Sequence, residues 1–200
     1  SHDFPLTQGV IDNDDNLHAF LSKLSPDGQK LLFSTFFGNS PREGISGLTL
    51  DDNDDIYIVG ATYTEGLAVT AHAFRKEIII PESGYLMDHF IAKINASDHK
   101  TSYLSYFASN SYSMASIQWI KPNRLIVCGS TTGESFPVTD HAMSKIGKGN
   151  LDCFVSVFNV ETMALDYASL FGGSDEDRVM SANFINKETI VIGGLTNSAD

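Results

Sequence analysis

The segment from Gly172 to Asp177 combines two glycines, Ser174 and three consecutive acidic residues. Carboxylate and hydroxyl oxygens are ligands that Ca²⁺ prefers, and glycines allow a loop to fold closely around an ion. One hypothesis is therefore a calcium loop, and the alternative is a plain connection between two pieces of sheet. A calcium site takes about six or more oxygen ligands, so the equivalent segments elsewhere in the chain provide a test.

Two further acidic runs carry oxygen ligands at high density. The run 51–55 contains four carboxylates and one amide, and Asp12, Asp14 and Asp15 form a similar cluster. Neither run has the internal glycine and distal glutamate of an EF-hand loop. We interpret both as solvated turns, with calcium as the alternative, and we expect no other cofactor.

The histidines and cysteines form no metal or nucleophile pattern. His72 and His141 occupy the same place in a Thr-x-His-Ala motif, where a third copy has Gly9. Because glycine tolerates positive φ, this interchange predicts a loop position that tolerates unusual backbone angles rather than a catalytic base or metal ligand. Cys128 and Cys153 lie in apolar segments, and we expect buried free thiols. We assign no catalytic, cofactor-binding or metal-binding residues.

The candidate residues belong to three copies of one unit, repeated about every 66 residues. Each copy begins at a phenylalanine (Phe20, Phe90 or Phe154) and has an aromatic residue followed by a small one seventeen positions later. A later apolar strand carries a glycine that we align as Gly60, Gly129 and Gly193. In the same alignment, Leu50, Ile120 and Phe184 are equivalent.

The alignment tests the acidic segment. Asp175 corresponds to Pro41 in one copy and Ser111 in another, and Glu176 corresponds to Arg42 in the first of them. A cation site is therefore not a property of the repeat, although this one copy could still hold one. Glycines for the turn and polar residues for solvent explain the segment as a joint between sheets.

The local pattern predicts β-strands throughout. In the first copy, strands over 20–24 and 31–37 flank a Pro-Asp-Gly turn, and strands over 46–50 and 56–62 flank the acidic run. Trp119 lies in the corresponding strand pattern and is expected in the core. Four strands repeated at this period indicate a β-propeller blade, and a β-sandwich is the structural alternative.

We therefore predict an all-β fold, a β-propeller segment of four-stranded antiparallel blades with about three repeats. Residues 1–200 form a single segment, with repeat units over approximately 17–76, 88–145 and 152–200 and the tail of a preceding unit over 1–14. The expected full blades are Gly44–Phe107 and Met114–Phe171, flanked by half-blades over 17–38 and 178–196. Because three units are too few to close a propeller, we expect covalent continuation into further blades of a larger propeller; a closed assembly of several copies is the alternative.

Composition narrows the classes of partner. The formal net charge of −12 argues against nucleic acid, which is bound by basic surfaces. No apolar run approaches the roughly 18 residues of a membrane-spanning helix. A protein or polysaccharide partner is compatible with these limits, but the sequence does not identify one.

The run AFLSKLSPDGQKLLFSTFFGNS, the hairpin GLTLDDNDDIYIVGAT and the tails DFPLT and SFPVT together resemble the bacterial SBBP repeat, named for seven-bladed β-propellers. The resemblance covers essentially the whole chain, but residues 108–111 replace the usual Gly-Gly-Ser in the second copy. It implies a propeller segment of an exported or cell-surface bacterial protein. It implies no catalytic residues, because the family shares none.

These observations predict a non-catalytic repeat module that serves as a scaffold or as a protein or ligand interaction surface. One alternative is an enzyme, a hydrolase or lyase, with its site on loops at the channel end of the propeller, because propellers host such sites. Another is a glycan-binding module that uses Tyr63, Tyr85 and Tyr112. Acids, histidines or arginines from several blades meeting in one pocket would favour the enzyme.

Overall fold

The computed structural model of the chain describes residues 4–7, 19–38, 43–63, 65–79, 87–108, 111–133, 135–186 and 189–200. The protein is all-β, with 54% of the described residues in strands, and its antiparallel sheets are arranged like the blades of a propeller segment that does not close into a ring. The described residues contain no helix that is long and apolar enough to cross a membrane. The predicted fold class is confirmed.

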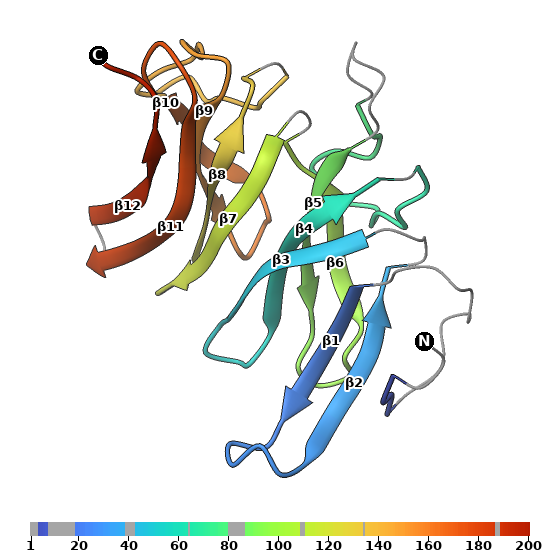
Figure 1. Cartoon of the computed structure of the whole chain (residues 1–200). Helices are drawn as coiled ribbons and strands as arrows, with labels where there is room; N and C mark the ends of the chain where they lie inside the picture. The colour runs from blue at the N-terminus through green and yellow to red at the C-terminus, as the bar shows by residue number, and fades with distance from the viewer. Residues whose placement is uncertain are drawn as a thin grey trace.

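Two sheets are complete four-stranded blades (Figure 1). The first contains β3 (Glu43–Leu50), β4 (Ile56–Thr62), β5 (Asp88–Ile94) and β6 (Thr101–Tyr106), paired in that order. The second contains β7 (Ser111–Ile120), β8 (Arg124–Thr131), β9 (Asp152–Asn159) and β10 (Leu165–Phe171), again paired in chain order. These sheets match the blades predicted from the repeat.

The other two sheets are hairpins, made of β1 (Ala19–Leu24) with β2 (Leu31–Phe37) and of β11 (Asp177–Asn186) with β12 (Thr189–Thr196). They confirm the two predicted half-blades. By their place in the repeat, β1 and β2 correspond to the outer strands β5 and β6, whereas β11 and β12 correspond to the inner strands β3 and β4. One hairpin therefore corresponds to the outer half of a blade and the other to the inner half, in two separate sheets.

The inner strands contact one another in series, β3 with β7 and β7 with β11. Between the two full blades lies the largest apolar cluster, in which the rings of Phe107, Phe136, Phe154 and Phe158 meet at tilted or edge-on angles. Such aromatic pairs add about 0.5–1.5 kcal/mol each beyond the area that they bury. Trp119 packs against the same cluster, as expected from its strand pattern.

A short tail covers the outer edge of three of the sheets, beside β2, β6 and β10. In every copy the N–H of a threonine donates to an outer-strand carbonyl: Thr7 to Ser34 at 3.0 Å, Thr70 to Leu104 at 2.9 Å, and Thr139 to Ala168 at 3.1 Å. The threonine hydroxyl lies within hydrogen-bond distance of the same outer-strand residue in all three copies. The recurring Leu/Val-Thr of the repeat thus satisfies backbone groups that an open edge would leave unpaired.

The structure corrects the alignment of one glycine. A Cβ on Gly60, Gly129 or Gly194 would lie 2.0, 2.1 or 1.9 Å from a backbone oxygen of the neighbouring inner strand, whereas a Cβ on Gly193 would have no heavy atom within 4 Å. The equivalent residue is therefore Gly194, and the prediction of Gly193 is wrong. The close approach occurs beside a β-bulge in β3, β7 and β11, where two residues of the inner strand oppose one of its partner.

A second correction concerns β7. Trp119 pairs with Leu125 as Leu50 pairs with Ile56, so Trp119 and not Ile120 is the counterpart of Leu50. The strand β7 contains a second register shift, between Ser111 and Ser113, which the other inner strands lack at that place. An extra bulged residue changes no side-chain type in the sequence, so a gapless alignment passes over it.

Candidate functional site

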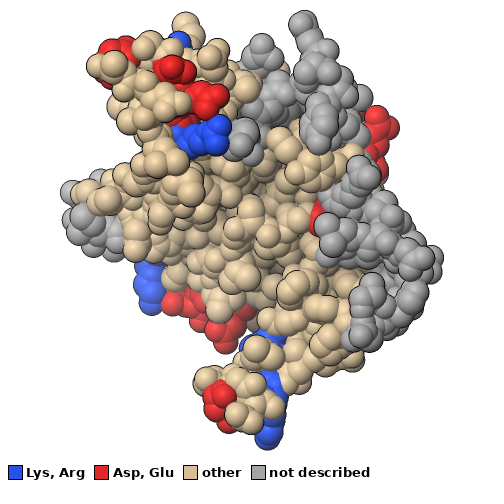
Figure 2. Space-filling view, viewed as in Figure 1, with Lys and Arg blue, Asp and Glu red and all other residues tan. Residues whose placement is uncertain are grey.

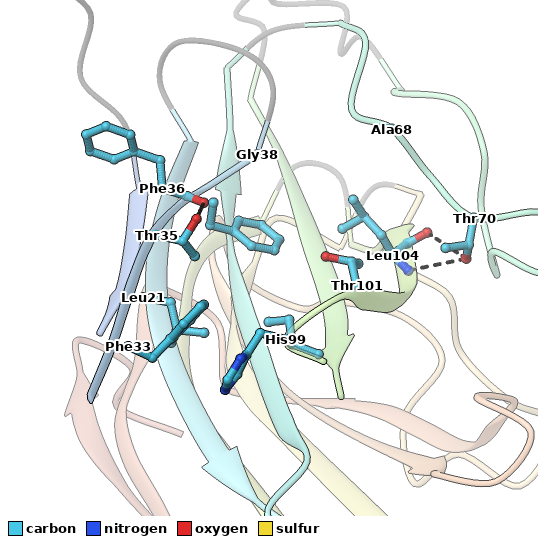
Figure 3. Close-up of a pocket in the computed structure, with 12 residues that line it drawn as sticks. Leu21, Phe33, Thr35, Phe36, Gly38, Ala68, Thr70, His99, Thr101 and Leu104 are labelled. Carbon is cyan, nitrogen blue, oxygen red and sulfur yellow. Dashed lines mark hydrogen bonds between the residues drawn. The ribbon is translucent and has the colours of Figure 1, made fainter. Parts of the chain in front are cut away.

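A cleft between the first half-blade and the first full blade contains a cavity of about 290 Å³ (Figure 3). Figure 3 shows Leu21 and Phe33 of the half-blade on one side and Thr101 and Leu104 of β6 on the other. The lining is mainly apolar, with a few hydroxyl groups among carbon atoms. This composition is typical of sites that bind apolar or aromatic groups and orient them with few polar contacts.

His99 links this cavity to a second one of about 300 Å³, because both are lined by Leu21, Phe33 and His99. The imidazole of His99 stacks on the ring of Phe33, with 4.0 Å between ring centroids and 14° between ring planes. His99 has φ of 56°, a left-handed conformation that places it in the turn between β5 and β6. No sequence pattern marks His99 as a cavity residue, because its partner Phe33 comes from the preceding half-blade.

The polar groups of the first cavity are mostly engaged within the protein. The hydroxyl of Thr70 lies 3.3 Å from both the backbone nitrogen and the carbonyl oxygen of Leu104, and the hydroxyl of Thr35 donates to the carbonyl of Phe36 at 3.0 Å. The cavity lining contains one histidine and no acid or arginine. Acids, histidines and arginines from several blades therefore do not converge in this cavity.

The acidic segment 172–177 joins β10 to β11 and is held by its own hydrogen bonds. The carboxylate of Asp177 accepts from the N–H of Gly173 at 2.7 Å and the hydroxyl of Ser198 at 3.1 Å. Burial alone would raise the pKa of this carboxyl, but hydrogen bonds from Thr196, Gly173 and Ser198 outweigh it and lower the pKa. Glu176 forms an ion pair with Arg178 at 2.9 Å. The interpretation as a joint between sheets is confirmed.

Asp177 has a counterpart in the first copy. Glu43 opposes Thr62 at the start of its blade as Asp177 opposes Thr196, and both acids are buried. A Cβ on Gly38 would lie 2.6 Å from Glu43 Oε2. The carboxylate of Glu43 therefore requires a small residue at position 38. The buried acid is thus a part of the blade that two copies share.

The acidic run 51–55 is a hairpin turn, as predicted. Asp51 Oδ1 accepts from the N–H groups of Asn53 and Asp55 at 2.8 and 3.0 Å, which closes the turn. Asp55 forms an ion pair with Lys93 at 2.9 Å, and Asp52 pairs with Lys121 of the next blade at 2.8 Å. Three of the four carboxylates therefore have partners within the protein.

His72 and His141 lie in exposed turns, in which the N–H of the following alanine donates to the threonine two residues before the histidine, at 3.1 Å in both copies. The loop position is confirmed, but neither histidine has positive φ. The turn therefore does not use unusual backbone angles at either histidine, and an ordinary turn accepts glycine and histidine alike. No group of three or more histidine, cysteine or acidic side chains that could hold a metal ion occurs among the described residues.

Further titratable groups are buried in the two full blades. Cys128 and Cys153 are free and buried, as expected, and burial raises the pKa of their thiols to about 12 and about 11. Burial lowers the pKa of His89 to about 4. Asp88 is fully buried and paired with Arg75 through two bonds of 2.6 and 2.7 Å. This pair was not predicted from the sequence, because Arg75 lies in the tail, 13 residues before Asp88 at the start of β5.

Several predicted positions lie outside the described residues. Asp12, Asp14, Asp15 and Tyr85 are among them, as is the side chain of Tyr112. Tyr63, the remaining candidate for glycan binding, is 37% exposed. No known protein-family model matches the chain, and no curated protein matches it significantly.

Proposed function

We propose that this protein is a non-catalytic β-propeller repeat module whose apolar cleft between the first half-blade and the first full blade binds a partner. The resemblance to SBBP repeats supports a place in an exported or cell-surface bacterial protein. The partner offers an apolar or aromatic group, from a protein segment or a small ligand, because the cleft presents aromatic and aliphatic side chains with few hydroxyls.

The observation that carries the proposal is that the polar side chains recurring in the full blades form hydrogen bonds to the tails. The hydroxyls of Tyr103 and Tyr167 accept from the N–H groups of Phe74 and Met143 at 3.0 and 3.3 Å, at equivalent places in the two full blades. Ser105 and Ser169 accept from the same two tails at 2.9 and 3.0 Å. The polar positions that the repeat shares therefore hold the tails on the blades, which is the work of a scaffold.

The proposal is tested by placing a tryptophan at each of two adjacent positions of β6, of which only one lines the cleft. Thr101 lines the cavity, whereas Ser102 is exposed and is not part of its lining. Screening by NMR with a library of small aromatic and aliphatic fragments should give hits that Thr101→Trp abolishes and Ser102→Trp retains. Hits that persist in Thr101→Trp would refute the cleft as the binding surface. Hydrolysis of, or elimination from, a panel of ester, peptide and glycoside substrates would instead establish the enzyme alternative.

A further inference from the structure

The cavity of about 290 Å³ lies at one of two blade interfaces that are built from equivalent residues. The first interface is the contact between the half-blade β1–β2 and the first full blade, and the second is the contact between the two full blades. Every residue that lines the cavity has a counterpart at the second interface by its place in the repeat. Most of these counterparts are buried in the aromatic cluster, so the second interface shows how the same elements pack when side chains fill the space between them.

Three lining positions are large and apolar at the second interface but smaller or polar at the first. The pairs of counterparts are Ile94 with Phe158, His99 with Met163, and Thr101 with Leu165. Two of these pairs follow from the strand register, in which Ile94 opposes Thr101 as Phe158 opposes Leu165. The third follows from the turn, because His99 and Met163 have φ of 56° and 53° and each donates its backbone N–H to an asparagine carbonyl, at 3.0 and 2.7 Å.

At the second interface, the first of these positions supplies an aromatic ring. The ring of Phe158 lies 5.0 Å from that of Phe107, with 75° between the ring planes. Phe37 is the counterpart of Phe107 and lines the cavity, but the position of Phe158 is held by Ile94, which has no ring. A ring bound in the cavity would therefore find with Phe37 the edge-on contact that Phe158 makes with Phe107, an arrangement that aromatic pairs favour.

The other two positions bring polar atoms to the cavity. Figure 3 shows the side chains of His99 and Thr101 among those that line it. Among the described residues, no hydrogen bond engages the Thr101 hydroxyl or the His99 imidazole. Phe33 covers one face of the imidazole and leaves the nitrogen atoms at the ring edge uncovered by that contact. A hydroxyl group on the ligand can therefore bond to either side chain.

The charge and the size of the cavity define the rest of the ligand. Its described lining contains no acid, lysine or arginine, so an ionised ligand would lose hydration without gaining a partner. On the face drawn in Figure 2, too, charged side chains gather toward the ends of the sheets, with a broad uncharged area between them. An apolar cavity of about 150 Å³ holds benzene, so 290 Å³ accommodates a single substituted ring.

Backbone groups beside the cavity are already paired, which favours a small molecule over a protein segment. The N–H of Thr70 donates to the carbonyl of Leu104 at 2.9 Å, and the Thr70 hydroxyl lies 3.3 Å from the Leu104 nitrogen. A peptide that adds to a sheet edge needs such groups free, because main-chain hydrogen bonds supply much of its affinity.

We propose that the cavity at the first interface binds a small neutral phenol, with its ring edge-on to Phe37 and its hydroxyl bonded to Thr101 or His99. This inference rests on the proposed function, because it names the ligand class of the same cleft. It assigns the change from leucine and methionine to threonine and histidine a role in recognising the hydroxyl.

The first test compares four probes of similar size by NMR titration of the full chain: phenol, toluene, cyclohexanol and benzoate. We expect phenol to bind most tightly. Toluene should bind about fivefold more weakly, which is the effect of one lost hydrogen bond. Cyclohexanol keeps the hydroxyl without the aromatic ring and should also bind more weakly, and benzoate should not bind. Equal affinity of the cleft for phenol and toluene, or for phenol and cyclohexanol, would overturn the inference.

The second test removes each polar group while keeping the shape of the site. Thr101→Val should weaken phenol binding about fivefold or, if His99 is the partner, His99→Met should do so, and toluene binding should be unchanged. Ser102→Val is the matched control and should change neither affinity. Met163 already occupies the equivalent turn with the same φ, so the turn accepts methionine. A preference for phenol over toluene that survives both substitutions would refute the assigned contacts.

Two outcomes separate this inference from the proposed function. Phenol and toluene that bind alike and are both displaced by Thr101→Trp would overturn the phenol assignment and retain the cleft as a binding surface. No probe or fragment bound in the cleft would overturn both. The capped peptide acetyl-Gly-Tyr-Gly-amide carries the same phenol on a backbone, and tighter binding of this peptide than of phenol would assign the cleft to a protein segment instead.

Discussion

The burial of His89 makes the stability of the protein sensitive to mild acid. The side chain is 3% exposed, and its Nδ1 has no hydrogen-bond partner among the described residues. Removal from water disfavours the charged imidazolium and lowers its pKa from 6.5 to about 4, although a hydrogen bond with the Ala108 backbone opposes this shift.

The size of the effect follows from the two pKa values. Above pH 6.5 the imidazole is neutral in both the folded and the unfolded chain, and no stability is lost. Below pH 6.5 His89 of the unfolded chain binds a proton, whereas His89 of the folded chain stays neutral down to about pH 4. The free energy of unfolding therefore falls as the pH falls. The loss is about 2 kcal/mol at pH 5 and approaches roughly 3 kcal/mol below pH 4.

The assay is urea unfolding between pH 7.5 and pH 4.5 for the wild type and for His89→Cys. Cysteine is the matched substitution, because Cys153 occupies the equivalent place in the second blade. At pH 7.5 the two proteins report the packing cost of the substitution alone. Between pH 6.5 and pH 4.5 the wild type should lose about 2 kcal/mol more than the variant, and NMR of the native wild type should show the imidazole titrating near pH 4.

Parallel stability profiles for the two proteins would refute this reasoning. So would a native imidazole that titrates near 6.5, because burial would then not disfavour its charged form. Other groups that titrate in this range affect both proteins alike, so the difference between the two profiles isolates His89.

Three further outcomes are expected from the structure. Gly60→Ala should lower the free energy of unfolding by about 1–3 kcal/mol, because the added Cβ would clash with backbone atoms. Gly193→Ala is the control and should stay within about 0.5 kcal/mol of the wild type. Equal effects of the two substitutions in urea unfolding would contradict the bulge geometry. Arg75→Ala should cost about 3 kcal/mol because it strips a buried carboxylate, Asp88, of its bidentate partner. Both cysteines should resist a thiol-modifying reagent at pH 8 until the protein unfolds, and rapid native labelling would show that they are accessible.

The strand order of each blade could be predicted from the sequence because it depends on local sequence patterns. The turn at Pro26-Asp27-Gly28, with φ of 71° at Gly28, and the alternating strands on either side define a hairpin without reference to other blades. Repetition of that hairpin then separates what the unit needs from what varies. The same comparison identified the acidic segment near Gly172 as a joint rather than a site.

Features that depend on contact between segments distant in the sequence could not be predicted from it. The close contact at Gly194, whose added Cβ would lie 1.9 Å from a backbone oxygen of β11, depends on a bulge in that neighbouring strand. The cleft exists because Phe33 and His99 meet from different blades. Exposure of Phe20, which is buried in its two counterparts, depends on which strands have neighbours. Hydrophobic periodicity and turn chemistry act over a few residues, so they can be recognised in the sequence. Which side chains are buried and where cavities form depends on the packing of whole sheets, so only the tertiary structure decides them.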